Sequence, residues 1–149
     1  MSRPLASLSL DLDNLWSYMK IHGDPGWQTR PSYLDAVVPY VLDVLERERL
    51  RITFFVVGAD AAETRNHAAL RSIVTAGHEV GNHSFEHEPW LHLYSREQLE
   101  REVDTTDDAI EAATGVRPNG FRGPGFSWCP ELLEVLSARG YVYDASTLP

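Results

Sequence analysis

The sequence has little of what secreted and membrane proteins rely on. It contains a single cysteine, Cys129, so no disulfide can form within the chain. Its apolar stretches are short, as at residues 52–57, and none is long enough to cross a bilayer. The opening residues, MSRPLASL, lack the apolar core of a secretory signal peptide. These absences predict a cytoplasmic protein that does not associate with a membrane.

Positive charge is also scarce. The chain has 13 Lys and Arg residues against 22 Asp and Glu residues, which gives a net charge of −9. A surface of that sign repels a phosphate backbone, so we do not expect nucleic acid as a partner. The length of 149 residues, with 43% hydrophobic and 23% charged residues, is typical of one globular domain over residues 1–149.

Short β-rich runs alternate with amphipathic helical patterns along the chain. Residues 12–31, rich in Gly, Pro and Trp, are expected to form a long loop. Such alternation predicts an α/β fold with parallel strands and right-handed crossovers. It fits either an open doubly wound sheet or the first five or so strands of a β/α barrel. Strands are expected at residues 5–11, 52–57, 78–82, 119–122 and 141–144, and helices from residue 34, at 59–76, from the capping box of Ser95 and Gln98 to Gly115, and at 130–139.

The last predicted strand reaches residue 144, and the sequence stops at Pro149. No predicted helix follows to cover that strand, whereas parallel strands are normally covered on both faces. We therefore expect a truncated barrel that is part of a longer protein. An uncovered strand would also favour self-association of the chain.

Polar side chains follow several of the predicted strands. Asp11 and Asp13 follow the first strand, His83 the third and Arg122 the fourth, and the carboxyl ends of parallel strands form the usual active-site edge. Asp11 and Asp13 are two residues apart, so an extended backbone points both the same way. His83 and His87 are four apart, and one helical turn would bring both imidazoles together.

Two imidazoles and one carboxylate would suit zinc or a similar divalent ion and leave coordination positions open for water and substrate. Asp13, His83 and His87 are therefore candidate metal ligands. Asp11 is then a candidate base that takes a proton from the attacking water, and Arg122 would aim that carboxylate. A non-haem iron centre also uses two histidines and a carboxylate, but it leaves Asp11 and Arg122 without a role.

Plainer interpretations exist for each of these residues. A His-x-x-x-His pair is often incidental, aspartates after a strand can be solvated, and an arginine can be an ordinary ion-pair partner. The remaining histidines lack any such joint placement, and we expect surface or structural roles for them (His22, His67, His78 and His92). Most of the tryptophans fall in predicted loops, where they would either pack the loops or offer a stacking surface for sugar rings (Trp16, Trp27, Trp90 and Trp128).

At these motifs the sequence resembles the polysaccharide deacetylases of the NodB-homology type, carbohydrate esterase family 4. The stretch SLDLDN at residues 9–14 is similar to the family's first motif, HSFEH at 83–87 to its second and RGPGF at 122–126 to its third, while TFFVVG at 53–58 looks like its second strand. The resemblance implies that Asp11 and Arg122 are catalytic and that Asp13, His83 and His87 bind the metal. It also implies substrate contacts by the third motif and the residues after it (Pro124, Phe126 and Trp128).

The chain departs from the family pattern at two places. Leu12 separates two acids that are commonly adjacent, and Gly125 stands between Pro124 and the aromatic Phe126. Two later family motifs are absent, so the general-acid histidine is expected beyond residue 149. The family fold is a deformed barrel of seven or eight strands, of which this chain would supply about five.

The resemblance implies one divalent metal, with zinc expected and cobalt, nickel or iron as alternatives. The implied reaction is removal of N-acetyl groups from an N-acetylated sugar or polysaccharide, and the present segment alone is expected to be a weak or inactive enzyme. Two other functions fit the same pattern. One is allantoinase-like hydrolysis of a small amide, and the other is a non-catalytic domain that binds metal or carbohydrate.

Overall fold

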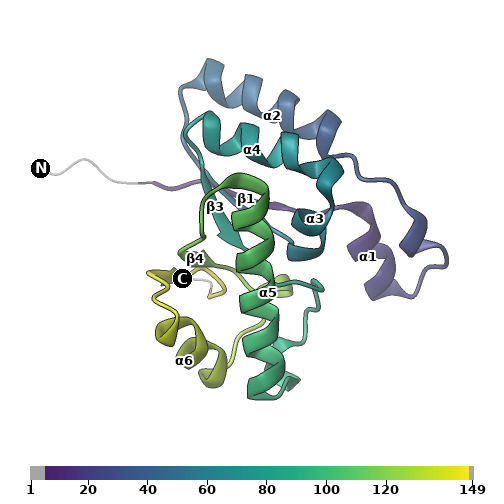
Figure 1. The fold of residues 1–149 in the computed structure, drawn as a ribbon, viewed down its shortest axis with the longest axis vertical. Helices are drawn as coiled ribbons and strands as arrows, with labels where there is room; N and C mark the ends of the chain where they lie inside the picture. Colours follow the sequence, from purple (N-terminus) through teal and green to yellow (C-terminus); the bar gives the residue numbers. More distant parts are fainter. Residues whose placement is uncertain (1–5, 148–149) are drawn as a thin grey trace, which may run out of the picture.

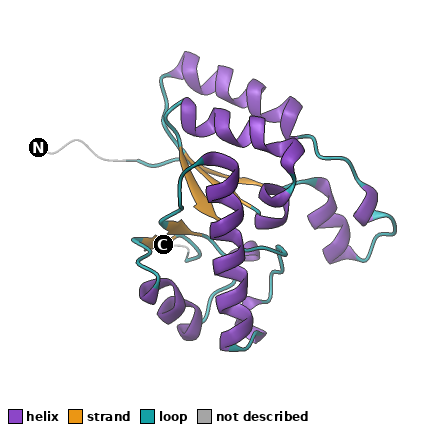
Figure 2. Cartoon of the chain, viewed as in Figure 1, coloured by secondary structure: helices purple, strands orange, loops and turns teal. Residues whose placement is uncertain are grey.

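A five-stranded parallel sheet forms the centre of the protein, whose computed structural model describes residues 6–147 (Figures 1 and 2). The strand order β1-β2-β3-β4-β5 follows the order along the chain. All four neighbouring pairs are parallel, so the predicted α/β fold is confirmed. The strands are β1 (Ser9–Leu12), β2 (Thr53–Val56), β3 (Glu79–Asn82), β4 (Gly120–Phe121) and β5 (Tyr143–Asp144).

This strand order separates the two architectures that the sequence allowed. A doubly wound sheet reverses its strand order at a switch point, whereas a barrel adds each strand beside the last. The sequential order is therefore the winding of a barrel segment. The helices that connect the strands are α1 (Leu15–His22), α2 (Leu34–Glu48), α3 (Gly58–Ala62), α4 (His67–Thr75), α5 (Arg96–Thr114) and α6 (Pro130–Ala138).

Two hydrophobic clusters join the helices to the sheet. The first buries residues of β1 to β3 against α2, α4 and α5, and Phe54, Leu70 and Ile110 are almost fully buried in it. The second packs Phe121 of β4 against α5 and α6. The long helix α5 contributes to both clusters, and Figure 1 shows it running from the level of α6 past β4 and β3. The helix α5 therefore connects the cluster that packs on β1 to β3 with the cluster that packs on β4.

Local signals set the ends of α5 as the sequence predicted. The Ser95 hydroxyl accepts from the Gln98 N–H, and the Gln98 side chain accepts from the Ser95 N–H, which completes the capping box. Gly115 ends the helix in the left-handed conformation that glycine adopts readily.

Two predictions need correction, one of a loop and one of a helix. Residues 12–31 are not one long loop, because they contain the helix α1 and the short 3-10 helix Trp27–Thr29. Glycine and proline further along the segment masked this two-turn helix, which ends at Gly23. The helix expected at 59–76 is broken into α3 and α4 at Glu63, whose backbone is extended. The Asn66 side chain donates to the carbonyl of Asp60 across this break.

The strands are shorter than expected. The first begins at Ser9 instead of residue 5, which lies outside the described residues, and includes Asp11 and Leu12. No helix in the described part of the chain is long and apolar enough to cross a membrane.

Candidate metal centre

The predicted polar residues converge at the carboxyl edge of the sheet. Asp11 lies within β1 and Asp13 just after it, while His83 follows β3 and Arg122 follows β4. The Nε2 atom of His83 lies 3.5 Å from Asp13 Oδ1 and 3.9 Å from Asp11 Oδ2. Both aspartates therefore face the same imidazole, as their spacing on an extended strand predicted.

Asp13, His83 and His87 form a compact set of donor atoms. One atom from each lies within 4.8 Å of the others, and Asp13 Oδ1 is 3.3 Å from His87 Nε2. Two ligands bound at about 2.1 Å with a tetrahedral angle lie roughly 3.4 Å apart. The distances from Asp13 Oδ1 to His83 Nε2 and to His87 Nε2, 3.5 and 3.3 Å, are therefore close to the spacing that a single divalent ion requires.

Hydrogen bonding shows which atoms are available to a metal. His83 Nδ1 lies 2.6 Å from the carbonyl oxygen of Arg122, which can only accept, so Nδ1 donates. Burial lowers the pKa of His83, which favours the neutral ring with a free lone pair on Nε2. Asp13 Oδ1 is buried without a hydrogen-bond partner among the described residues. The chemistry of the donors therefore fits a divalent cation.

Asp13 is held as a carboxylate. Its side chain is 9% exposed, and burial by itself raises its pKa. The neighbouring His87 and His83 imidazoles and the Tyr18 hydroxyl outweigh that effect, so the pKa of Asp13 lies below its ordinary value. The negative charge that a metal ligand needs is thus favoured by the site itself.

Asp11 is paired with Arg122 beside the metal-binding residues. Arg122 Nη1 donates to Asp11 Oδ1 at 2.7 Å, and Nη2 donates to the Ser9 hydroxyl at 2.8 Å. The guanidinium is also fixed by the Ala145 carbonyl, and it lies 4.3 Å from the centre of the Phe55 ring. Arg122 is therefore held by several partners, and it keeps the Asp11 carboxylate beside the centre, with Oδ2 3.9 Å from His83 Nε2.

The loop from His83 to His87 does not form the expected helical turn. Ser84 and His87 have positive φ values of 58° and 55°, yet the two imidazole rings still meet at 5.1 Å. Such backbone conformations are costly for residues other than glycine and need support from their surroundings. The imidazoles of His83 and His87 meet as predicted, but a loop with two positive φ values brings them together, and not a helical turn.

Several elements supply that brace. The Asn82 side chain accepts from the Ser84 N–H at 2.8 Å, and Glu102 of α5 accepts from the N–H groups of Phe85 and Glu86 at 2.7 and 3.0 Å. The backbone of α3 donates to the carbonyls of Ser84 and Phe85. It can approach this closely because Gly58 has no side chain: a Cβ there would lie 2.6 Å from the Phe85 ring.

The predicted substrate residues lie at the same edge but differ in exposure. Pro124 is buried, while Phe126 and Trp128 are exposed. The Phe126 ring centre lies 5.9 Å from the guanidinium carbon of Arg122, close to the centre. The Phe126 N–H donates to the Gly123 carbonyl at 2.9 Å, so this aromatic residue does not offer a free backbone donor.

The other histidines and two of the tryptophans have local structural contacts. His78 accepts from the Ile52 N–H, His92 contacts the Ser127 hydroxyl, and His22 and His67 contact backbone carbonyls. Trp16 packs on Trp27 with ring centres 6.0 Å apart. These contacts agree with the structural roles expected for the four histidines.

Sequence reasoning missed the contribution of α1. The Tyr18 hydroxyl donates to Asp13 Oδ2 at 2.9 Å, and Lys20 forms ion pairs of 2.7 Å with both Glu86 and Glu88, on either side of His87. The local signals for α1 are the glycine at its end, Gly23, and the basic residues of its last turn, Lys20 and His22. Nothing in the sequence pattern indicated which residues the helix would face.

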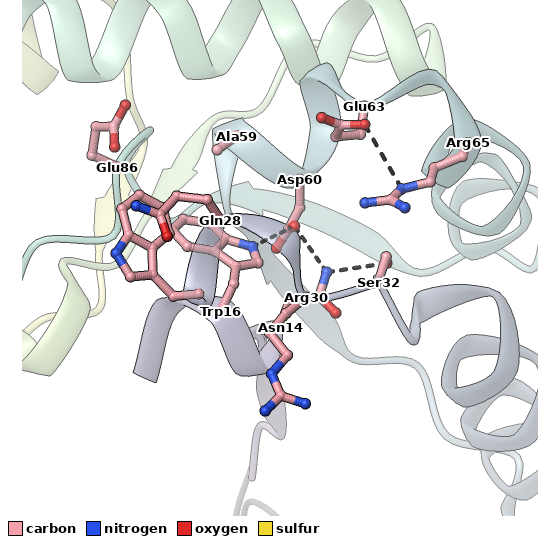
Figure 3. A pocket seen from close by; sticks show the side chains of 11 residues that line it. Asn14, Trp16, Gln28, Arg30, Ser32, Ala59, Asp60, Glu63, Arg65 and Glu86 are labelled. Atoms are coloured by element: carbon pink, nitrogen blue, oxygen red, sulfur yellow. Dashed lines mark hydrogen bonds and ion pairs between the residues drawn. The ribbon is translucent and has the colours of Figure 1, made fainter. Parts of the chain in front are cut away.

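A pocket of about 260 Å³ adjoins the centre between α1, the turn at Trp27 and α3 (Figure 3). Asn14 and Glu86 line it, and these residues are the chain neighbours of Asp13 and His87. Figure 3 shows the Asp60 carboxylate between Trp16 and Asn14, both of which donate to it at 2.8 Å. Burial raises the pKa of Asp60.

The fold and the centre together define a class: a parallel α/β protein wound like a barrel, with an Asp-His-His cluster and an Asp-Arg pair at the carboxyl edge of its strands. The family model described as polysaccharide deacetylase matches residues 24–143. The chain therefore belongs to the polysaccharide deacetylase family. The matched region includes His83, His87 and Arg122, whereas Asp11 and Asp13 precede it.

Individual relatives agree with this membership. A chitooligosaccharide deacetylase of Sinorhizobium fredii is 36% identical over 103 residues, which cover 68% of this chain and 46% of that protein. A structure from Mycobacterium smegmatis described as a polysaccharide deacetylase superposes with a TM-score of 0.78 at 27% identity, covering 93% of this chain and 49% of the other. A family 4 acetyl xylan esterase from Clostridium thermocellum, in complex with cobalt, gives a TM-score of 0.67 at 26% identity over 87% of this chain and 53% of that one.

The chain spans less than half of the length of the curated relatives it matches. It corresponds to about half of the Mycobacterium smegmatis structure.

Proposed function

We propose that the protein containing this chain is a metal-dependent hydrolase that removes N-acetyl groups from an N-acetylated sugar or polysaccharide. One observation carries the proposal: the Asp13, His83 and His87 donors lie together, with the Asp11–Arg122 pair beside them. Membership of the polysaccharide deacetylase family and the chitooligosaccharide deacetylase among its relatives support the choice of reaction and substrate.

Each residue has a distinct role in this proposal. A divalent ion held by Asp13, His83 and His87 would supply Lewis-acid chemistry toward the acetyl carbonyl and the attacking water. Asp11 takes a proton from that water while the water oxygen forms the new bond to the carbonyl carbon. Arg122 keeps the Asp11 carboxylate aimed, because its guanidinium is fixed by Ser9 and Ala145. The leaving amine needs a proton donor, which we place outside residues 1–149.

We propose zinc as the metal, because two imidazoles and one carboxylate suit it and leave positions open. Cobalt, nickel and iron share these ligand preferences, and a relative has been solved with cobalt. The cytoplasmic location and the self-association expected from the sequence stay predictions.

The metal is tested by measuring the metal content of the purified chain after dialysis. The wild-type chain should hold one divalent ion, and the His83→Ala/His87→Ala double variant should hold none. Equal trace content in both proteins would show that the metal centre does not exist.

The reaction is tested by assaying acetate release from N-acetylglucosamine oligomers with the full-length protein. Asp13→Ala should lose the metal because a ligand is removed. Asp11→Asn should keep the metal and lose turnover roughly 100-fold or more, as expected for a general base. Equal metal loss in both variants would make Asp11 a ligand, and full metal occupancy without acetate release by the wild type would point to a non-catalytic metal-binding domain.

A further inference from the structure

The two oxygens of the Asp13 carboxylate lie in different surroundings. Oδ1 faces His83 Nε2 and His87 Nε2 at 3.5 and 3.3 Å. Oδ2 accepts the hydroxyl of Tyr18 at 2.9 Å. A carboxylate can present either oxygen, or both, to a cation. The contact with Tyr18 therefore bears directly on which oxygen faces the imidazoles.

Tyr18 is held in place because α1 is anchored on both sides of it. Toward the start of the helix, Asn14 Nδ2 and Trp16 Nε1 both donate to Asp60 Oδ1 at 2.8 Å, as Figure 3 shows. Asp60 is only 3% exposed, so this anchor is buried. Toward the end of the helix, Lys20 pairs with Glu86 and Glu88 at 2.7 Å. The helix is thus attached to α3 and to the ligand loop at the same time.

We propose that Tyr18 is a positioning residue of the metal centre, whose hydroxyl holds Asp13 Oδ2 so that Oδ1 alone is presented between the two imidazoles. This inference rests on the metal centre of the proposed function. Groups that hydrogen-bond to metal ligands orient them, and losing such a partner typically weakens metal binding roughly 10- to 100-fold. Without the hydroxyl, Asp13 Oδ2 loses this hydrogen-bond donor, and the orientation of the carboxylate is less restricted.

Two further features suit Tyr18 to this role. Its hydroxyl lies 2.9 Å from Asp13 Oδ2, and a tyrosine hydroxyl is a donor at neutral pH. The helix that carries it, Leu15–His22, precedes the region 24–143 that matches the family model. Tyr18 is therefore a feature of this chain that the family match does not assign.

The test is Tyr18→Phe, which removes one oxygen atom from a side chain that is 48% exposed and so leaves the core intact. The matched control is Tyr40→Phe, because Tyr40 is 70% exposed on α2 and is not one of the residues that form the centre. Zinc affinity is measured for all three proteins by competition with a chelator, and the absorption spectrum of the cobalt-loaded proteins reports the coordination geometry.

The expected result is a zinc affinity roughly 10-fold or more weaker in Tyr18→Phe, with a changed cobalt spectrum, while Tyr40→Phe matches the wild type. Wild-type affinity and spectrum in Tyr18→Phe would overturn the inference, as would an equal loss in Tyr40→Phe. A wild-type chain that binds no zinc or cobalt would refute the metal centre itself, which distinguishes the failure of the proposed function from the failure of this inference.

Discussion

The loop that carries His83 and His87 is held by hydrogen bonds to its backbone, whereas the segment at residues 14–33 that faces it is held by side chains. Glu102 and Asn82 accept three N–H groups of the loop, and α3 donates to two of its carbonyls. The segment relies on the buried Asp60 and on Lys20. Both segments contribute side chains to the metal centre, but backbone hydrogen bonds hold the first and side-chain contacts hold the second.

This difference has an energetic consequence. An N–H that loses its acceptor away from water costs about 1–3 kcal/mol, and the partly buried N–H groups of Phe85 and Glu86 both depend on Glu102. Ion pairs with partial access to water contribute less, because solvent competes for the charges. We therefore expect substitutions that remove contacts of the loop to have larger effects than substitutions in the facing segment.

The largest effect is expected from Glu102→Ala. It removes the common acceptor of the Phe85 and Glu86 N–H groups, so the free energy of unfolding should fall by about 2–4 kcal/mol, and zinc affinity should fall roughly 10-fold or more. Chemical denaturation and chelator competition measure the two quantities. Glu102→Gln keeps one acceptor oxygen and should lose less, and Glu100→Gln on the exposed side of α5 is the control. An unchanged zinc affinity in Glu102→Ala would show that the loop needs no brace.

An intermediate effect is expected from Lys20→Met, which tests the facing segment. Lys20 is the only lysine in the sequence, and its side chain is mostly buried between Glu86 and Glu88. Its loss should cost about 1–2 kcal/mol of stability, because the largely buried Glu88 loses its partner. Zinc affinity should fall only a few-fold, because the backbone brace of the loop remains. Lys20→Arg keeps the charge and should recover part of both. A larger loss of zinc affinity in Lys20→Met than in Glu102→Ala would reverse the comparison.

The smallest effect is expected from Asp104→Asn, which lies outside both segments. The Arg139 guanidinium donates to Asp104 and lowers the pKa of that carboxyl below its ordinary value of 3.8. A depressed pKa means that the stabilisation is present above pH 3.8 and is lost as the pH falls through the folded-state pKa. Because the pair is half exposed, the variant should lose about 0.5 kcal/mol or less at neutral pH, with zinc affinity unchanged.

That prediction is checked by comparing the free energy of unfolding of the wild type and Asp104→Asn at neutral pH and in acid. The difference between them should shrink on acidification. A difference that grows instead would mean that Arg139 does not stabilise the ionised carboxyl. A change in zinc affinity would show that the α5–α6 contact reaches the metal centre.

The residues of the centre could be predicted because all but His87 lie at or next to strand ends, which the local pattern reveals. Asp11 and Asp13 share a side of an extended strand whatever the rest of the fold does. The pair His83 and His87 was predicted to converge through a helical turn, and it converges instead through a loop with two positive φ values. The sequence pattern identified which side chains meet, but not the backbone conformation that brings them together.

Residues whose roles depend on distant partners could not be predicted in the same way. Tyr18 and Lys20 lie in a segment that we expected to be a loop, and Lys20 reaches a partner 66 positions away. Glu102 occupies a partly buried position on α5, and only its contacts with the ligand loop distinguish it from the other acids of that helix.

Local sequence signals account for the alternation of strands and helices, the parallel sheet and the set of polar residues at its carboxyl edge. These follow from hydrophobic periodicity and from turn and capping residues, which act over a few neighbouring positions. Long-range packing places α1 against the ligand loop, brings Tyr18 to Asp13 and lets Glu102 support the backbone beside His87. Such contacts join segments far apart in the chain, and packing and hydrogen-bond satisfaction in the folded molecule select them, since no local spacing encodes them.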